Sequence, residues 1–99
     1  MISRHWSGLA NREHAEAYVN HLRTETIPSL HTIPGFIHAS VLCRSVYNAV
    51  EFLVITEWDS LEAIRAFTGE NVEEAVVPEI VREMMIEYDQ KVRHYEVVM

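Results

Sequence analysis

Residues 50–58 read Val-Glu-Phe-Leu-Val-Ile-Thr-Glu-Trp, the strongest β-strand signal in this chain. β-branched and aromatic residues favour a strand, and neither Gly nor Pro interrupts the run. Side chains alternate between the two faces of a strand, so Phe52 and Val54 share one face while Leu53 and Ile55 share the other. The strand is therefore apolar on both faces, and we expect both faces of its sheet to be covered.

Further strands and helices flank this run. Alternation of apolar residues predicts strands, and apolar residues at helical spacing predict helices. The predicted strands are residues 2–8, 36–45, 50–58 and 91–98. The predicted helices are residues 11–26, 59–68 and 79–89. Asp59 is expected to cap the second helix, Gly69 to end it, and Asn71 to cap a further helix that Pro78 divides. The order β-α-β-β-α-β predicts an α+β, ferredoxin-like fold with a four-stranded antiparallel sheet and helices on one face.

Composition narrows the class of protein. The chain of 99 residues is predicted to form one domain, residues 1–99, and its formal net charge of −7 argues against a nucleic-acid partner. Cys43 is the only cysteine, which excludes an intramolecular disulfide, and no His or carboxylate spacing predicts a metal site. No Gly-rich phosphate loop, signal peptide or membrane-length apolar run is found. We expect a cytoplasmic protein that needs neither metal nor flavin.

Residues 54–67, Val-Ile-Thr-Glu-Trp-Asp-Ser-Leu-Glu-Ala-Ile-Arg-Ala-Phe, carry a resemblance to a known family. An apolar strand ending in Trp, an acidic and Ser turn, and a helix with an aromatic residue near its end resemble the antibiotic biosynthesis monooxygenase (ABM) superfamily. The tail at residues 92–98, Val-Arg-His-Tyr-Glu-Val-Val, is similar to that of short members. The matching topology extends over essentially the whole chain.

The resemblance implies a dimeric α+β barrel, in which two copies pack sheet to sheet and each holds a pocket between its sheet and helices. Members include cofactor-independent oxygenases that convert phenols to quinones, and heme-degrading enzymes. The heme-degrading pattern has an Asn in the first strand, a Trp late in the helix after the third strand, and a His beyond it. Here the predicted first strand has no Asn, Phe67 takes the Trp position, and residues 73–75 supply no His.

Two residues are the candidate catalytic groups. His94 is proposed as the base that deprotonates a phenol or enol, because an ordinary His pKa is about 6.5. The alternative is a strand His bonded to a neighbouring side chain. Trp6 is proposed to stack on an aromatic substrate beside His94, if the register of the strands puts both on one face. The alternative for Trp6 is core packing.

The candidate substrate-binding residues are Arg4, Tyr18, Trp58, Phe67 and Met85. Arg4 would stabilise an enolate, and its alternative is a salt bridge with the acidic second half of the chain. For Trp58 and Met85, the alternative is the core. His14, His21 and His38 are expected to be structural or solvated.

The sequence therefore predicts a cofactor-independent monooxygenase that acts on a small planar aromatic or enolisable substrate. The alternative is a non-catalytic homodimer of the same fold that binds a small ligand or heme. For heme, His94 or His38 would be the axial ligand. Neither a nucleic acid nor a membrane is an expected partner.

Overall fold

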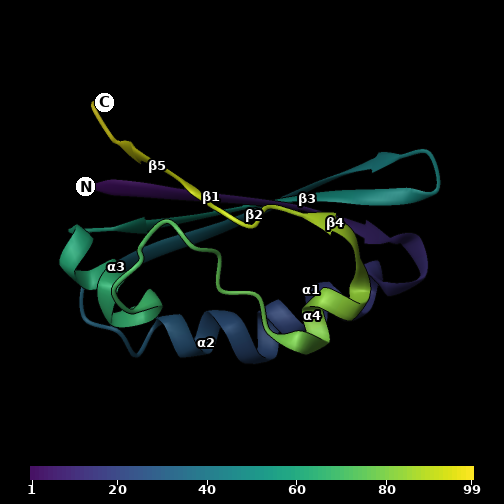
Figure 1. Ribbon diagram of the computed structural model, residues 1–99, viewed down its shortest axis with the longest axis horizontal. Coiled ribbons are helices and arrows are strands. Elements are labelled where there is room, and N and C mark those ends of the chain that lie inside the picture. The colour runs from purple at the N-terminus through teal and green to yellow at the C-terminus, as the bar shows by residue number, and fades with distance from the viewer.

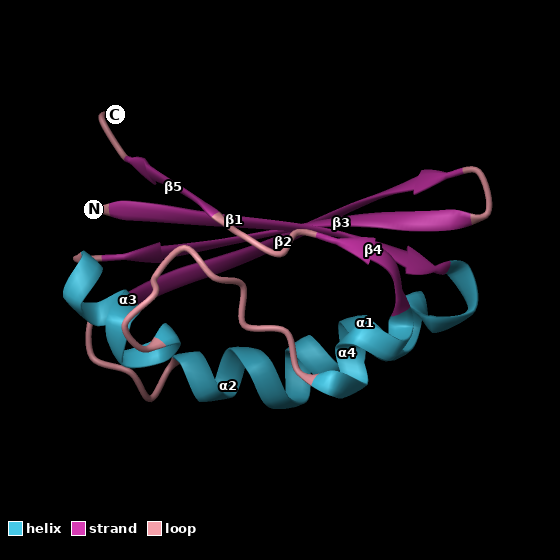
Figure 2. Ribbon diagram, in the orientation of Figure 1, coloured by secondary structure: helices cyan, strands magenta, loops and turns pink.

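A computed structural model describes all residues, 1–99, as one antiparallel sheet with every helix against the same face (Figures 1 and 2). The strands are β1 (Ile2–Asn11), β2 (Phe36–Val46), β3 (Ala49–Trp58), β4 (Met85–Tyr88) and β5 (Arg93–Glu96). Their order is β2-β3-β1-β4, and β5 also pairs with β1. The ferredoxin-like arrangement is confirmed.

The fourth strand of this arrangement is divided into two pieces. β4 pairs with Gly8–Ala10 near the end of β1, and β5 pairs with Ile2–His5 near its start. Residues 85–88, predicted as the end of a helix, are therefore a strand. The helix prediction is wrong there because the apolar run Met84-Met85-Ile86 fits either period. The unpaired edge of β1 offers backbone hydrogen bonds that a helix cannot use.

The first helical stretch is longer than the predicted residues 11–26. It consists of a 3₁₀ turn at Arg12–His14, α1 (Ala15–His21), a π-helical turn at Leu22–Thr26 and α2 (Ile27–Leu30). Pro28 lies in the first turn of α2 and has no N–H to give to the carbonyl four residues earlier. Just before it, the Ile27 N–H bonds to Leu22 O, five residues back, so this turn contains one residue more than an α-helical turn between donor and acceptor.

The second half of the chain contains two short helices, α3 (Leu61–Thr68) and α4 (Glu79–Met84). Ser60 caps α3 by accepting a hydrogen bond from the Ala63 N–H, so the prediction that Asp59 is the cap is wrong by one residue. Gly69 ends α3 with a φ of +86°, as predicted. Asn71 starts no helix; its side chain accepts a bond from the Glu73 N–H within the irregular segment of residues 69–78.

Two hydrophobic clusters lie between the sheet and the helices. One contains Phe52 and Met85 together with Tyr18 and Leu22 of the long helix. The other contains Trp58 and Ile64 together with Leu30. Residues of both clusters, with the irregular segment 69–78, enclose a cavity that neither cluster fills.

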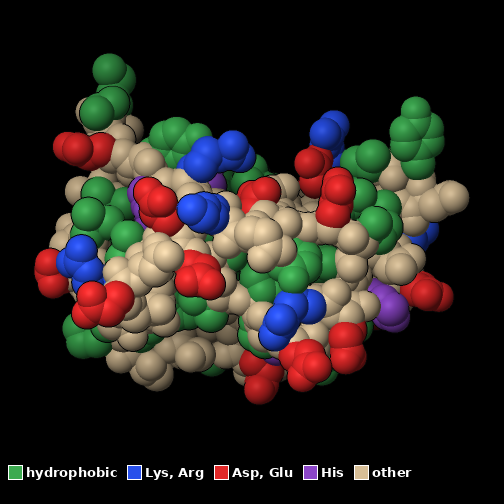
Figure 3. Space-filling model, in the orientation of Figure 1, with side chains coloured by type: hydrophobic (Ala, Val, Ile, Leu, Met, Phe, Trp, Pro, Cys, Tyr) green, Lys and Arg blue, Asp and Glu red, His purple; other side chains and the backbone are tan.

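No element of the chain covers the other face of the sheet (Figure 1). Leu53 and Ile55 face this way, paired across the strands with Leu42 and Ser40 of β2, and Leu9 lies on the same face of β1. The β2–β3 hairpin tip and the C-terminus rise on this side, and hydrophobic side chains gather at both ends (Figure 3). None of the helices has the length and apolar character needed to cross a membrane.

Candidate functional site

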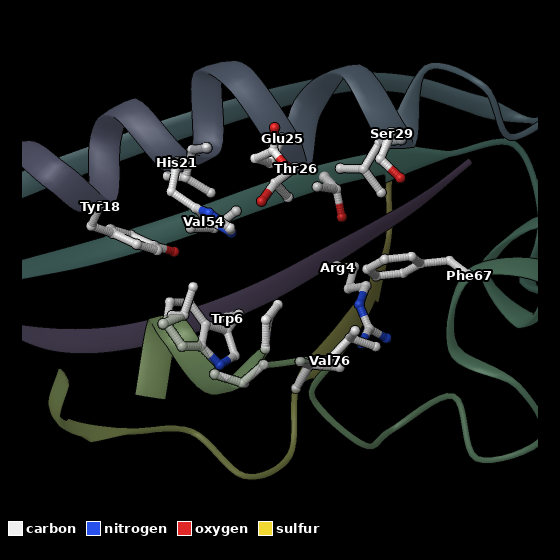
Figure 4. A pocket seen from close by; sticks show the side chains of 17 residues that line it. Arg4, Trp6, Tyr18, His21, Glu25, Thr26, Ser29, Val54, Phe67 and Val76 are labelled. Atoms are coloured by element: carbon white, nitrogen blue, oxygen red, sulfur yellow. The ribbon is translucent and has the colours of Figure 1, made fainter. Parts of the chain in front are cut away.

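The cavity between the sheet and the helices has a volume of about 400 Å³, and ten of its 17 lining residues are hydrophobic. That volume is within the range of small-molecule sites in proteins. The central strand β1 supplies Arg4 and Trp6, α1 supplies Tyr18 and His21, and α3 supplies Phe67 (Figure 4). Four predicted substrate or catalytic residues, Arg4, Trp6, Tyr18 and Phe67, therefore lie around one space.

Trp6 forms an aromatic wall of the cavity. Its indole Nε1 donates to the Asp89 backbone carbonyl at 3.1 Å, and the rings of Tyr18 and Tyr88 lie 6.2 and 6.3 Å away. Gly8, two residues along the same face, makes room for this ring, because a Cβ there would lie 2.5 Å from Trp6 Cη2. The indole thus lies flat over the strand because Nε1 is hydrogen-bonded to Asp89 and because Gly8 has no side chain to displace it.

Tyr18 closes one end of the cavity. Its ring packs edge-on against Phe52, with centroids 4.9 Å apart, and only 3% of the residue is exposed. Burial raises the pKa of the Tyr18 phenol above its usual value, so it remains protonated at neutral pH. Its hydroxyl has no hydrogen-bond partner within the protein and points into the cavity (Figure 4). It is free to bond a ligand.

Arg4 lies toward the other end and is only 5% exposed. One terminal nitrogen donates to the Val72 carbonyl and to His94 Nε2, the latter at 3.0 Å, and the other donates to the Glu74 carbonyl at 3.0 Å. The guanidinium carbon lies 5.7 Å from the centre of the Phe67 ring, over its face. Arg4 thus ties the sheet to the irregular segment 69–78.

The Arg4 charge has no carboxylate partner. The two salt bridges of the protein are Arg44–Glu51 and Arg65–Glu62, both on the surface, so the alternative of a salt bridge for Arg4 is not found. Burial lowers the pKa of Arg4 to about 10, which leaves the guanidinium charged at neutral pH. A charge taken from water without a counter-charge costs free energy, and an anion in the cavity would offset part of that cost.

His94 lies behind Arg4 and does not line the cavity. It is paired with Arg4 across the β5–β1 ladder, so it is on the same sheet face as Trp6. An arginine has no acceptor, so His94 Nε2 accepts the hydrogen bond and its imidazole is neutral. Burial, then the Arg4 charge, lowers the pKa of His94, while Glu73 opposes this shift. The geometry agrees with the alternative of a strand His bonded to a neighbouring side chain, and a role as base stays a prediction.

Trp58 and Met85 do not line the cavity, and their contact with substrate stays a prediction. Trp58 is fully buried, donates to the Thr56 hydroxyl at 2.9 Å and stacks on Phe67 with centroids 5.9 Å apart. Met85 is 9% exposed within the core cluster around Phe52. Their positions agree with the alternative of core packing, since neither strand alternation at Trp58 nor helical spacing at Met85 gives the depth of a side chain.

His21 is the residue that the sequence analysis missed. It was expected to be structural or solvated, but it lines the cavity and its ring points from the helix toward Val54 (Figure 4). The available signal was its place three residues after Tyr18, which puts both on one helix face. The π-helical turn that follows brings Leu22, Glu25 and Thr26 to the cavity as well.

The family comparison agrees with this geometry. A family model described as antibiotic biosynthesis monooxygenase matches residues 9–77. The chain belongs to the antibiotic biosynthesis monooxygenase family. A search of the curated proteins found no match. No group of three or more His, Cys, Asp or Glu side chains in this ABM protein could hold a metal ion.

Solved structures share the fold of this ABM protein. A Deinococcus radiodurans protein provisionally named an antibiotic biosynthesis monooxygenase has a TM-score of 0.70 and 21% identity, over 100% of this chain and 94% of its own. A Bacillus cereus protein with the same provisional name has a TM-score of 0.67 and 19% identity, over 99% and 95%. The heme-degrader MhuD of Mycobacterium tuberculosis, with two hemes bound in its active site, has a TM-score of 0.59 and 18% identity, over 98% and 96%.

The Arg4–His94 contact predicts a pH dependence of stability. The folded-state pKa of His94 is below the ordinary 6.5, so below about pH 6.5 the unfolded chain binds a proton that the folded chain resists. Stability therefore falls as the pH drops through this range. We expect a lower urea midpoint at pH 5.5 than at pH 7.5, measured by circular dichroism.

His5 has a pKa lowered in the same direction, so a variant must separate the two. In His94→Gln, the amide oxygen still accepts from Arg4 but does not titrate. The loss of stability between pH 7.5 and 5.5 should be smaller in this variant than in the wild type. An equal loss in both proteins would show that His94 is not responsible.

Proposed function

We propose that this protein is a cofactor-independent monooxygenase that oxidises a small planar aromatic or enolisable substrate in the cavity between β1 and α1. The observation that carries the proposal is the convergence of Trp6, Tyr18, His21 and Arg4 on one largely apolar space of about 400 Å³. An aromatic wall, a neutral hydroxyl, an imidazole and a cation are the groups needed to bind and deprotonate a phenol or enol. Membership of the ABM family supports the same reaction class.

The chemistry needs no external reductant. Loss of a proton from the phenol or enol gives an anion whose ring carbon is electron-rich. That carbon passes electrons to dioxygen and forms a carbon–oxygen bond, giving a peroxide on carbon. Cleavage of the O–O bond leaves one oxygen on carbon as the carbonyl of a quinone and releases the other as water. A phenol with a free para position and one O₂ thus give one quinone and one H₂O, with the substrate supplying all the electrons.

Two imidazoles compete for the role of base. His21 lines the cavity, whereas the Nε2 of His94 is already occupied by Arg4. We therefore propose His21 as the group that takes the proton, with His94 as a positioning residue that orients Arg4. Trp6 and Phe67 hold the planar body of the substrate, and the Tyr18 hydroxyl bonds its oxygen. The apolar lining excludes water from the anion.

Heme is the weaker alternative. The fold likeness to MhuD favours it, but neither imidazole expected as an axial ligand suits the cavity. His38 is on β2, paired with Glu57 and hydrogen-bonded to Ser40 on the sheet face away from the cavity. His94 Nε2 accepts from Arg4 and has no free electron pair for iron. We therefore assign no step of the reaction to heme.

Oxygen uptake tests the proposal. Purified protein, free of added cofactor, should consume one O₂ per quinone formed with at least one member of a panel of naphthols that have a free para position. His21→Ala should lower kcat by 100-fold or more, which is the usual contribution of a general base. His94→Ala should raise KM and lower kcat by less, while His31→Ala, an exposed residue outside the cavity, should change neither.

A larger loss of kcat in His94→Ala than in His21→Ala would return the base to His94. No uptake with any compound that binds would favour a non-catalytic binding protein. A Soret band that saturates at one hemin per chain and is lost in His21→Ala would favour the heme alternative.

We also propose that two copies associate through the bare face of the sheet. Leu53 and Ile55 lie there on β3, and Leu42 of β2 is 53% exposed beside Leu53. Leu9 of β1, paired with Glu51, lies on the same face. No helix or loop of the chain covers these residues, and a second apolar sheet face is the cover of matching chemistry. ABM membership favours the same assembly.

Light scattering measures this assembly directly. At micromolar concentration the mass should be twice the 11.5 kDa of one chain. Leu53→Glu places a charge at the centre of the bare face and should give a monomer. Ile80→Glu makes the same change at a 54% exposed site on α4, on the helical side, and should leave the dimer intact. A wild-type mass near 11.5 kDa would contradict the proposal.

A further inference from the structure

We infer that the substrate of this cavity is an organic acid: a planar body of two fused rings, with a carboxylate that pairs with Arg4 and a hydroxyl or keto oxygen that meets Tyr18. The inference rests on the proposed use of the cavity as a substrate site. It names the substrate class and gives Arg4 a different partner from the enolate that the sequence suggested.

Arg4 has donors to spare for such an anion. A guanidinium has five N–H groups, and three contacts to Val72 O, Glu74 O and His94 Nε2 use three of them. The Nε–H is one of the two left without an acceptor. All three existing partners are neutral, so they satisfy hydrogen bonds without neutralising the charge. A carboxylate would supply both an acceptor for the free donors and the missing negative charge.

The charged residues that line the cavity favour a ligand with a single negative charge, placed at Arg4. Glu25 is the only acidic residue among those that line it, and that residue is exposed on the helix. Arg4 is the only Lys or Arg of the lining and is buried beside Phe67. Hydrogen bonds between charged partners strengthen as water is excluded, so a monoanion gains most at Arg4.

Tyr18 marks the other end of the ligand. Its hydroxyl is aimed into the cavity, is 97% shielded with its residue, and bonds no protein atom (Figure 4). The hydroxyl is open to the cavity, so a ligand oxygen there would give it a hydrogen-bond partner that no protein atom supplies. His21 lies on the same helix face, so the oxygen at this end is also the one beside the proposed base.

The separation of the two ends sets the size of the ligand. The Tyr18 ring packs on Phe52, while Arg4 is paired across the ladder with Thr56, four residues further along β3. Four residues of strand span roughly 13 Å at about 3.3 Å per residue. Both side chains reach inward from these positions and shorten the gap. A naphthalene with a hydroxyl and a carboxylate at opposite ends comes closer to this length than a single ring does.

A structural role is the rival explanation, in which Arg4 only clasps the segment 69–78. It accounts for the bonds to Val72 and Glu74 but not for the two free N–H groups or for the unpartnered Tyr18 hydroxyl. The two explanations differ in whether charge on the ligand matters. A test must therefore compare ligands of equal shape and different charge.

Isothermal titration calorimetry with 6-hydroxy-2-naphthoate and its neutral amide makes this comparison. The acid should bind wild-type protein at least tenfold more tightly than the amide, as expected for charge-assisted hydrogen bonds. Arg4→Gln should abolish this preference, and Arg4→Lys should retain part of it because the cation remains. Arg23→Gln removes the same charge from an exposed helical site and should leave the preference unchanged.

Tyr18→Phe tests the other end. It should weaken binding of 6-hydroxy-2-naphthoate by three- to tenfold, the range for one neutral hydrogen bond, and leave 2-naphthoate unaffected. Tyr47→Phe, at the exposed hairpin tip, is the matched control. If Arg4→Gln does not fold, the comparison of acid with amide in wild-type protein and the Tyr18→Phe result still decide the inference.

Three results would overturn it: equal binding of acid and amide, a preference for the acid that survives in Arg4→Gln, or no binding of any probe at millimolar concentration. Failure here is separable from failure of the proposed function. Oxygen uptake with neutral naphthols and no preference for the acid would leave the oxygenase standing. Tight, Arg4-dependent binding of the acid, without oxygen uptake from any naphthol of the panel, would do the reverse.

Discussion

The Arg4 guanidinium is buried where the central strand, the last strand and the irregular segment 69–78 meet. Its bonds to the carbonyls of Val72 and Glu74 hold a segment that has no helix or strand of its own. Elsewhere that segment is held by backbone bonds to Gln90 and Val92. Its later residues form one wall of the cavity. The space between the two hydrophobic clusters thus depends on a cation at a position where an apolar side chain could have packed.

This arrangement has a cost in stability that a ligand can offset. A buried guanidinium loses its hydration, and neutral acceptors return only part of it. The Tyr18 hydroxyl is a second group, at the other end of the cavity, that bonds no protein atom. Binding sites commonly hold such groups in place before the ligand arrives, because pre-organised partners reduce the cost of ordering on binding. The same features that weaken the fold therefore give the cavity its preference for a ligand.

The sheet also separates two tasks. Its inner face carries Arg4 and Trp6 toward the cavity, while its outer face carries Leu53 and Ile55 toward the proposed partner copy. Because side chains alternate along each strand, a change on one face need not disturb the other. Substitutions that break the assembly and substitutions that alter ligand binding should therefore be separable in this protein.

Much of the fold could be predicted from the sequence, because the β3 run and the strand-to-helix segment that follows it are unambiguous. Alternation also put Arg4 and Trp6 on one face of β1. Which face of the last strand meets them depends on register, and the observed pairing of Arg4 with His94 could not be read from the sequence.

Other parts of the site could not be predicted for physical reasons. The sequence around Met85 fits a helix or a strand equally well. It forms a strand because the free edge of β1 offers backbone hydrogen-bond partners there. Strand alternation correctly puts Trp58 on the inner face of the sheet, but its ring stacks on Phe67 and does not reach the cavity. How deeply a side chain is buried depends on tertiary packing, which alternation does not show. His21 shares a helix face with Tyr18 through its spacing of three residues, but the sequence does not show that this face borders a cavity rather than solvent.

The central claim is that the Arg4 guanidinium binds the anionic group of a ligand. The NMR signal of the Arg4 Nε–H group reports this binding directly. In ¹⁵N-labelled protein, the Arg4 Nε–H resonance can be assigned by its loss in Arg4→Lys. Addition of 6-hydroxy-2-naphthoate should shift this resonance and slow its exchange with water, because the free Nε–H then has an acceptor. An Arg4 Nε–H resonance that stays unchanged while the acid binds would contradict the account.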